Sequence, residues 1–218
     1  MNTIHHIIWD WNGTLFDDAW LCVDILNQML ARYDLPAVTL TLYQEHFDFP
    51  VEKYYQKLGF DFDEKHSFHD ISFQYMDIYN KRRYECNLHD HALEIVKFVT
   101  GLGISQSILS AYHQTNLQEI VDYFHINKIF SYIVGLDNYY AASKIDIGKT
   151  LINNLNIDGD GILLVGDTKH DYEVARALGI QCILIPGGHQ KIERLMACDV
   201  PVVSSHNHIK EYLLHQKI

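Results

Sequence analysis

The sequence has few cysteines, no long apolar run and no leader-like start. Its four cysteines lie far apart among 218 residues and form no C-x-x-C pair. This spacing disfavours a disulfide framework and predicts reduced, mostly buried thiols. No apolar run approaches the roughly 20 residues that a bilayer-spanning helix needs, and no basic stretch followed by an apolar stretch marks a signal peptide. We therefore expect a soluble, cytoplasmic protein.

Positive charge is also scarce. The chain has 17 Lys and Arg against 28 Asp and Glu, for a formal net charge of −11. An excess of negative charge repels nucleic-acid backbones and acidic membrane surfaces, so we expect no nucleic-acid partner and no membrane partner. The same excess repels anionic small molecules. A phosphate site in this chain would therefore need local positive charge.

Apolar residues, in contrast, are plentiful. They make up 48% of the chain, which supports one sizeable core with room for a small second domain. Short β-branched apolar runs alternate with segments of helical period, as in a parallel sheet covered on both faces. The expected strands are 6–9, 107–110, 132–135, 162–166, 182–186 and 201–204, and the expected helices are 92–103, 115–124, 147–155 and 171–179. The alternation predicts a doubly wound, Rossmann-like α/β fold.

Residues 16–86 interrupt this alternation. The segment holds several aromatic-rich stretches of helical period and no convincing strand. Because it falls between the first two strands of the expected sheet, we predict a helical insertion. The expected organisation is an α/β core of residues 1–15 and 87–218 with an inserted helical domain of residues 16–86.

Polar residues gather where the expected strands end. Asp10 follows the first strand, Ser110 closes the second, and Lys144 follows the third. Asp167 and Asp171 follow the strand at 162–166. In an open parallel sheet, ligands bind outside the carboxyl ends of the strands, so these groups are expected to meet in one crevice. Each alone also fits an ordinary turn or helix cap, but their coincidence at several strand ends favours a site.

These residue types have a joint chemical logic. Two or more carboxylates with a backbone carbonyl form the hard oxygen site that Mg²⁺ prefers. Gly13 lets the backbone turn so that amides face an anion, and the Ser110 hydroxyl can donate to a phosphate oxygen. Lys144 can balance the clustered negative charge. Asp10 would then have an oxygen with which to attack phosphorus, which gives an aspartyl-phosphate.

The segments DWNGTL, ILSA and GDTKHD, together with Lys144, resemble in their order and spacing the haloacid dehalogenase-like superfamily, in its phosphoglycolate-phosphatase-like branch. The resemblance covers the whole chain, and the insertion falls where that family carries a small helical cap. It implies a Mg²⁺-dependent phosphatase that acts on a small phosphorylated metabolite.

The resemblance also implies a role for each matching residue. Asp10 corresponds to the nucleophile and first metal ligand, and residue 12 supplies a backbone carbonyl to the metal. Asp167 and Asp171 correspond to the other acids of the metal site. The matching catalytic positions are Asp10, Asn12, Ser110 and Lys144. The matching phosphate-binding positions are Gly13, Thr14, Ser110, Ala111 and Lys144.

Asn12 departs from the family pattern, in which the first motif usually reads D-x-D-G-T. The second Asp of that motif protonates the leaving alkoxide and then activates water, and an amide cannot move a proton in this way. Since general acid–base catalysis is worth about 10²–10⁴-fold, the change predicts a slow or specialised phosphatase. Its substrates would be those whose leaving group departs without a proton, such as aryl or acyl phosphates. His113 and His170 are the candidates to replace the missing group.

Two other functions stay open. Relatives that cleave phosphonoacetaldehyde also lack the second Asp but need a cap lysine, for which Lys53 and Lys57 are candidates. The chain could instead bind a phosphorylated ligand or a protein without turning it over.

The insertion is the expected source of substrate specificity. Its segment at 47–62 is rich in aromatic residues. Phe49, Tyr54 and Tyr55 are the candidate specificity residues, because a closing cap would bring them to the substrate and expel water.

Overall fold

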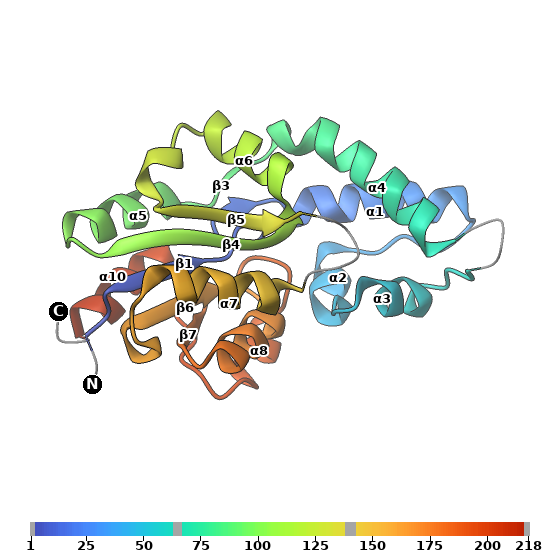
Figure 1. The fold of residues 1–218 in the computed structure, drawn as a ribbon. Coiled ribbons are helices and arrows are strands. Elements are labelled where there is room, and N and C mark those ends of the chain that lie inside the picture. The colour runs from blue at the N-terminus through green and yellow to red at the C-terminus, as the bar shows by residue number, and fades with distance from the viewer. Residues whose placement is uncertain (1–2, 63–66, 138–142, 216–218) are drawn as a thin grey trace.

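The core of the molecule is a five-stranded parallel sheet. The structure, a computed structural model, describes residues 3–62, 67–137 and 143–215. The strands are β1 (His6–Trp9), β4 (Ser105–His113), β5 (Tyr132–Leu136), β6 (Ile162–Gly166) and β7 (Gln181–Leu184). They lie in the order β5-β4-β1-β6-β7 (Figure 1). The chain extends the sheet to one side of β1 and then returns to the other side, so the strand order reverses next to β1, where such folds bind ligands.

Helices cover both faces of this sheet. One face packs against α5 (Ala92–Gly101), α6 (Gln114–Tyr123) and α10 (His206–His215). The other packs against α7 (Lys144–Leu155), α8 (Lys169–Leu178) and α9 (Ile192–Met196). Successive side chains of a strand alternate between faces, and Ile7 and Ile8 accordingly belong to different hydrophobic clusters. The predicted doubly wound α/β fold is confirmed.

A helical block lies between β1 and β4 in the chain. It contains α1 (Ala19–Arg32), α2 (Leu40–His46), α3 (Val51–Lys57) and α4 (Phe68–Arg82). Two short strands flank the block, β2 (Phe16–Asp17) and β3 (Asn87–Leu88), and they pair antiparallel. The two connections to the core therefore run side by side. In Figure 1 the block lies beyond the arrowhead of β5, at the carboxyl end of the sheet.

Several element boundaries differ from the sequence-based prediction. Residues 201–204 form no strand, and Val202 makes only an isolated bridge to Leu184. Pro201 contributes to this difference, because it has no N–H to donate to a ladder. Strand β4 continues past Ser110 to His113, with a register shift between Leu109 and His113. Ser110 thus lies within an irregular strand and not at its end.

Helix boundaries follow capping residues. Helix α7 begins at Lys144, earlier than predicted, because Ser143 and Asp146 form a capping box at its start. Gly103 and Gly179 follow α5 and α8 with positive φ angles of 75° and 67°, as expected for residues that end helices.

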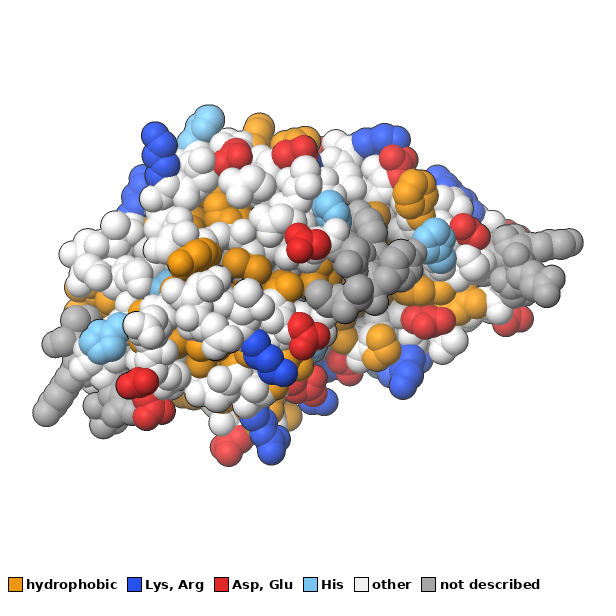
Figure 2. Space-filling model, viewed as in Figure 1, with side chains coloured by type: hydrophobic (Ala, Val, Ile, Leu, Met, Phe, Trp, Pro, Cys, Tyr) orange, Lys and Arg blue, Asp and Glu red, His pale blue; other side chains and the backbone are white. Residues whose placement is uncertain are grey.

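The surface carries dispersed charge. Acidic and basic side chains are interspersed over the face shown in Figure 2 and form no single patch there. Within the described ranges, every helix is too short or too polar to cross a membrane.

Candidate active site

Charged side chains from four elements meet at the carboxyl end of the sheet. Lys144, at the start of α7, places its Nζ 2.5 Å from Asp10 Oδ1 and 2.7 Å from Asp171 Oδ1. Thr14 Oγ1 donates to Asp167 Oδ1 at 2.9 Å and lies 3.4 Å from Asp10 Oδ2. All five side chains are buried. The sequence-based candidates Asp10, Thr14, Lys144, Asp167 and Asp171 therefore form one connected cluster.

Asp171 has two tasks in this cluster. Its Oδ2 accepts hydrogen bonds from the Thr168 hydroxyl at 2.6 Å and the Thr168 backbone N–H at 3.0 Å. These bonds form the capping box at the start of α8. Its other oxygen faces Lys144. The helix cap thus fixes the orientation of the carboxylate that holds the lysine.

The acidic cluster has the donor set of a hard divalent metal site. Asp10, Asp167 and Asp171 each offer a carboxylate oxygen, and these oxygens lie within 4.8 Å of one another. With Asp18, they make four buried carboxylates near two buried basic groups, Lys144 and His189. With all four carboxylates ionised and both basic groups protonated, two negative charges are left over, which one divalent cation would neutralise. Carboxylate oxygens at this spacing fit Mg²⁺.

The electrostatics of Asp10 reflect this excess of negative charge. Burial raises the pKa of Asp10 to about 8, since the Lys144 charge that lowers it is opposed by the charges of Asp171 and Asp167. Burial lowers the pKa of Lys144, but the two adjacent carboxylates outweigh this and raise it above its ordinary value. A cation bound among the acids would stabilise the anionic form of Asp10.

The phosphate-binding candidates lie beside the acids. Gly13 has a φ of +73°, and a Cβ placed there would come within 2.6 Å of His189 Cδ2, so only glycine fits. Ser110 is buried, and its Oγ accepts a hydrogen bond from the Tyr112 backbone N–H at 3.0 Å. Ala111 is exposed and lines the same cavity. The structure therefore brings these positions next to Asp10 and Asn12.

Asn12 is held by a carboxylate that the sequence analysis did not single out. Its Nδ2 donates to Asp18 Oδ2 at 2.8 Å and to the Tyr79 hydroxyl at 2.7 Å. Asp18 also accepts from the Gly13 backbone N–H at 2.9 Å and from the Tyr79 hydroxyl at 2.6 Å. An aspartate at position 12 would face Asp18 at hydrogen-bond distance. The amide removes that repulsion and binds the carboxylate.

His189 connects Asp18 to the metal-site acids and to the helical block. Its Nε2 lies 3.4 Å from Asp18 Oδ1, its Nδ1 lies 2.9 Å from the Tyr43 hydroxyl, and its backbone N–H donates to Asp167 Oδ2 at 2.6 Å. Burial lowers the pKa of His189, but Asp18, Asp167 and Asp10 outweigh this and raise it to about 9. Burial likewise raises the pKa of Asp18, and protonated His189 brings it below its usual range.

Sequence reasoning missed Asp18, Tyr79 and His189. The strand-end rule contains a signal for His189, which follows β7 in the segment PGGHQ. Asp18 lies in the same acidic stretch as the first motif. No comparable signal marks Tyr79, which reaches the site from α4.

The loop after β7 also binds the segment around α2. Gln44 Nε2 donates to the Gly188 carbonyl at 2.8 Å, and the Lys191 backbone N–H donates to the Gln44 carbonyl at 3.1 Å. Gln190 Nε2 donates to the Phe47 carbonyl at 3.0 Å. The loop after β7, whose His189 donates a hydrogen bond to Asp167, therefore also holds the helical block in place.

The acidic cluster opens into a cavity of about 580 Å³ beneath this block. Phe49, Tyr54 and Tyr55, the specificity candidates, all line it. Tyr54 and Tyr55 are buried, and Phe49 is 38% exposed. In contrast, Lys53 and Lys57 are exposed and are not among the lining residues.

Both candidate substitutes for the missing acid line this cavity. The His170 ring lies against Phe49 in a tilted arrangement, with ring centroids 4.6 Å apart. Burial, together with the Lys144 charge, lowers the pKa of His170. His113 lies in β4, three residues beyond Ser110.

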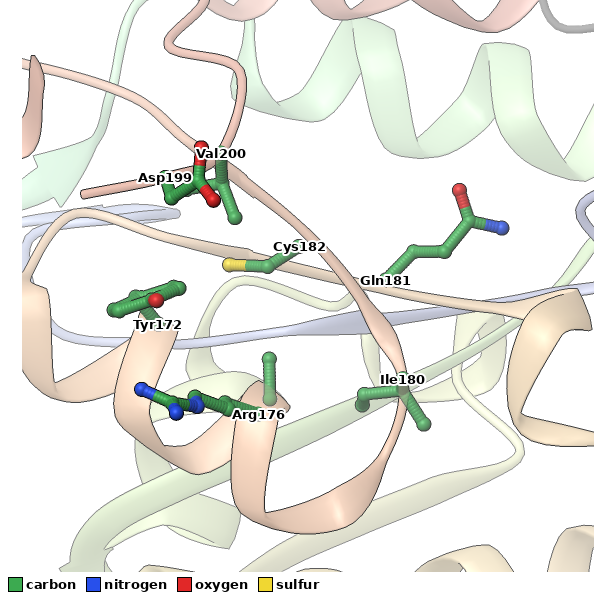
Figure 3. Close-up of a pocket in the computed structure, with 8 residues that line it drawn as sticks. Tyr172, Arg176, Ile180, Gln181, Cys182, Asp199 and Val200 are labelled. Carbon is green, nitrogen blue, oxygen red and sulfur yellow. The ribbon is translucent and has the colours of Figure 1, made fainter.

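A second hollow of about 500 Å³ lies elsewhere in the core, among α8, β7 and the segment before residue 201 (Figure 3). Tyr172 and Arg176 approach it from the helix, and Cys182 approaches it from the strand. It shares no lining residue with the cavity above the acids.

The fold and the acidic site define a hydrolase class. A family model described as haloacid dehalogenase-like hydrolase matches residues 7–185. The chain therefore belongs to the haloacid dehalogenase-like hydrolase family, as the resemblance implied. No curated protein matches the chain.

Solved structures have the same fold over nearly the whole chain. A haloacid dehalogenase-like family hydrolase from Streptococcus pneumoniae is 18% identical, with a TM-score of 0.83 and coverage of 97% of this chain and 99% of the other. A structure described as a predicted phosphatase from Clostridium acetobutylicum is 19% identical, with a TM-score of 0.83 and coverage of 98% and 100%. One described as a predicted phosphoglycolate phosphatase from Haemophilus somnus is 16% identical, with a TM-score of 0.80 and coverage of 97% and 99%. At these identities the likeness concerns the fold.

Proposed function

We propose that the protein is a phosphatase that hydrolyses a small phosphomonoester through an aspartyl-phosphate on Asp10. The observation that carries the proposal is the buried triad of Asp10, Lys144 and Asp171, in which one ammonium group holds two carboxylates at 2.5 and 2.7 Å. Lys144 orients one oxygen of Asp10 and leaves the other near Thr14. A buried carboxylate positioned in this way at a cavity floor is suited to nucleophilic attack.

Mg²⁺ is the proposed cofactor. Asp10, Asp167 and Asp171, with the backbone carbonyl of Asn12, would hold it, in keeping with the oxygen donors and the excess negative charge of the cluster. When bound, the ion supplies charge stabilisation to phosphoryl oxygens.

Side chains and backbone groups of the chain would stabilise the developing charge and bind the phosphoryl group. Lys144 offsets the negative charge that builds up as Asp10 approaches phosphorus. The Ser110 hydroxyl donates to a phosphoryl oxygen. Gly13, whose N–H is bound to Asp18, contributes the side-chain-free turn beside the phosphoryl group. Asn12 can donate a hydrogen bond but cannot supply a proton to the leaving oxygen.

The proposed role of the helical block is that of a cap. Residues 16–86 would close over a core of residues 1–15 and 87–218, exclude water and select the substrate through Phe49, Tyr54 and Tyr55.

The four cysteines are free, which supports a reducing setting such as the cytoplasm.

Beryllium fluoride, a phosphate mimic, tests the nucleophile. With Mg²⁺ it should form a stable adduct on Asp10 of the wild type, visible by ¹⁹F NMR, and none on Asp10→Asn. Asp17→Asn is the matched control, because Asp17 lies in the same segment and is outside the acidic cluster. An adduct on the wild type but no turnover of any phosphate ester would favour a protein that binds phosphorylated ligands. No adduct and no turnover would contradict the proposal.

Phosphonoacetaldehyde cleavage is a weaker alternative. It needs a lysine that forms a Schiff base with the substrate, and Lys53 and Lys57 are exposed outside the cavity lining. Borohydride trapping with phosphonoacetaldehyde should therefore leave both lysines unmodified.

A further inference from the structure

We propose that the leaving group of the substrate is an aromatic ring, so that the substrate is an aryl phosphate. This inference rests on the phosphatase function proposed above and names its substrate class. Two unrelated features of the cavity carry it: the nature of its walls, and the carboxamide at position 12.

The inserted helices give the cavity an aromatic wall. The rings of this wall come from α2, α3, α4 and the segment between α2 and α3, and they include Tyr43, Phe47, Phe49, Tyr54, Tyr55 and Phe73. Tyr43 and Phe47 stack with centroids 4.9 Å apart, and Phe47 meets Phe49 edge-on at 5.3 Å. A wall of ring faces and edges can continue the same contacts with a bound ring. The cavity volume of about 580 Å³ also falls in the range of pockets that bury small organic ligands.

The charges of the lining disfavour a second anionic group on the substrate. Among the described lining residues, Lys144 is the one lysine, there is no arginine, and the basic side chain of His189 is already placed against Asp18, with its Nε2 3.4 Å from Asp18 Oδ1. Lys144 is already bound to Asp10 and Asp171. Asp77 adds further negative charge to the lining. A carboxylate or second phosphate on the substrate would face acids without a cation of its own. An uncharged ring avoids this penalty.

Tyr54 supplies a specific polar group within the aromatic wall. It is 2% exposed, and its hydroxyl has no hydrogen-bond partner among the described residues. A buried hydroxyl without a partner is costly. A polar substituent on the bound ring can accept the hydrogen bond of Tyr54, which favours a substituted ring over an unsubstituted one.

Position 12 selects for the same leaving group by chemistry. In the first step an oxygen of Asp10 forms a bond to phosphorus while the bond from phosphorus to the aryl oxygen breaks. The electron pair of that bond leaves on the aryloxide, which takes a proton from water afterwards. A phenol has a pKa of about 10, so its anion departs without a donor. An alkoxide is far more basic and needs the proton that Asn12 cannot give.

The second step predicts a kinetic signature. Water forms a bond to phosphorus, the bond from phosphorus to Asp10 breaks, and its electron pair returns to the carboxylate while the water proton passes to phosphate or solvent. The Nδ2 of Asn12 is engaged by Asp18 and Tyr79, and a carboxamide is no base for that proton. Breakdown of the aspartyl-phosphate should therefore be slower than its formation. Aryl phosphates should release about one phenol per enzyme in a burst and then share one steady-state rate.

The experiment uses the full chain with Mg²⁺ and three probe substrates: 4-nitrophenyl phosphate, acetyl phosphate and ethyl phosphate. Acetyl phosphate has a leaving group that needs no proton but has no ring, so it separates ring binding from leaving-group chemistry. We expect a burst with 4-nitrophenyl phosphate and a kcat/KM at least about 10²-fold above that for ethyl phosphate. A series of ring-substituted phenyl phosphates should show a common kcat.

Variants test the wall itself. Phe49→Ala should lower the ratio of kcat/KM for 4-nitrophenyl phosphate to that for acetyl phosphate by about 3- to 10-fold, the range expected for one lost aromatic contact. Phe49 is 38% exposed, so its truncation should leave the fold intact. Tyr132→Ala is the matched control, because Tyr132 is 39% exposed on β5 and does not line the cavity. It should leave the ratio unchanged.

The outcomes separate this inference from the function on which it rests. If acetyl phosphate is hydrolysed and Asp10 binds beryllium fluoride, but the ratio does not change in Phe49→Ala, the phosphatase stands and the aryl substrate is wrong. Equal kcat/KM for ethyl and 4-nitrophenyl phosphate would also overturn the inference alone. No turnover of any substrate and no adduct on Asp10 would overturn both.

Discussion

The two ends of β1 bury polar groups in different ways. At its first residue, the His6 ring lies between two serine hydroxyls, with Nδ1 2.6 Å from Ser105 Oγ and Nε2 2.9 Å from Ser107 Oγ. Just past its last residue, Asp10 lies among other charges. Burial lowers the pKa of His6 to about 4, so the histidine is neutral. One end of the strand holds a satisfied neutral group, and the other holds an unbalanced set of charges.

The difference shows that burial alone does not decide the direction of a pKa shift. His6 and His189 are both buried, yet the pKa of His6 is lowered while that of His189 is raised to about 9. The partners account for this, since hydroxyls do not compensate a charged ring and carboxylates do. A cluster of ionisable groups with shifted pKa values and an excess of one charge therefore marks a functional site better than a buried, hydrogen-bonded polar group does.

The largest effect is expected at the charged end. Asp10→Asn should lower phosphatase activity by at least about 10³-fold, because the proposed nucleophile is lost. It should not unfold the protein, since the substitution also removes one charge from a repelling cluster. Activity assays beside thermal melts of the same sample check both parts. Activity within tenfold of the wild type would assign the nucleophile elsewhere.

At the neutral end, the expected effect is on stability and its pH dependence. Since folding lowers the pKa of His6, the unfolded chain binds the extra proton between pH 6.5 and about 4. The contribution of neutral His6 is complete above pH 6.5 and is lost as the pH falls through this window, by up to about 3 kcal/mol. Urea unfolding at several pH values should show a flatter dependence for His6→Gln. An unchanged dependence would mean that His6 is not the group that titrates.

An exchange of the groups at positions 12 and 18 sharpens the comparison. Asn12→Asp alone would set two carboxylates at hydrogen-bond distance, and the pair would hold a shared proton. Asn12→Asp combined with Asp18→Asn keeps the amide–carboxylate pair and moves the acid to position 12. We expect the double variant to hydrolyse ethyl phosphate about 10²-fold faster than the wild type and the single variant to gain less. Equal rates for the two variants would show that Asp18 does not control the acid.

The smallest effect concerns the metal. A cation that binds only the folded protein should stabilise it by about 1.4 kcal/mol at tenfold excess over its Kd. For a chain of this size, Tm rises by roughly 2–4 °C per kcal/mol, so the expected rise is about 3–6 °C. Melts with and without Mg²⁺ should show this rise in the wild type and lose it in Asp167→Asn. The same rise in the variant would place the ion at a different site.

The sequence was sufficient to predict the parallel sheet and the residues that gather at the carboxyl ends of its strands. Asp10, Lys144, Asp167 and Asp171 could be expected to meet, because parallel strands present their carboxyl ends at one edge. The partner of Asn12 could not be foreseen, since it depends on side-chain orientation within a tight turn. Tyr79 and His189 come from distant segments, and only the folded chain brings them to Asp18. The strand expected at 201–204 was wrong because apolar composition alone does not guarantee a ladder.

The loop after β7 has a consequence for the timing of the reaction. Its His189 contacts both Asp167 and Tyr43, and Gly188 and Gln190 hold the segment around α2. Any outward swing of that segment must break bonds to the same few residues that support an acid of the site. In the proposed phosphatase, a movement of this segment that admits the ester and releases its products would therefore also disturb Asp167, so this short loop would limit the rate of turnover.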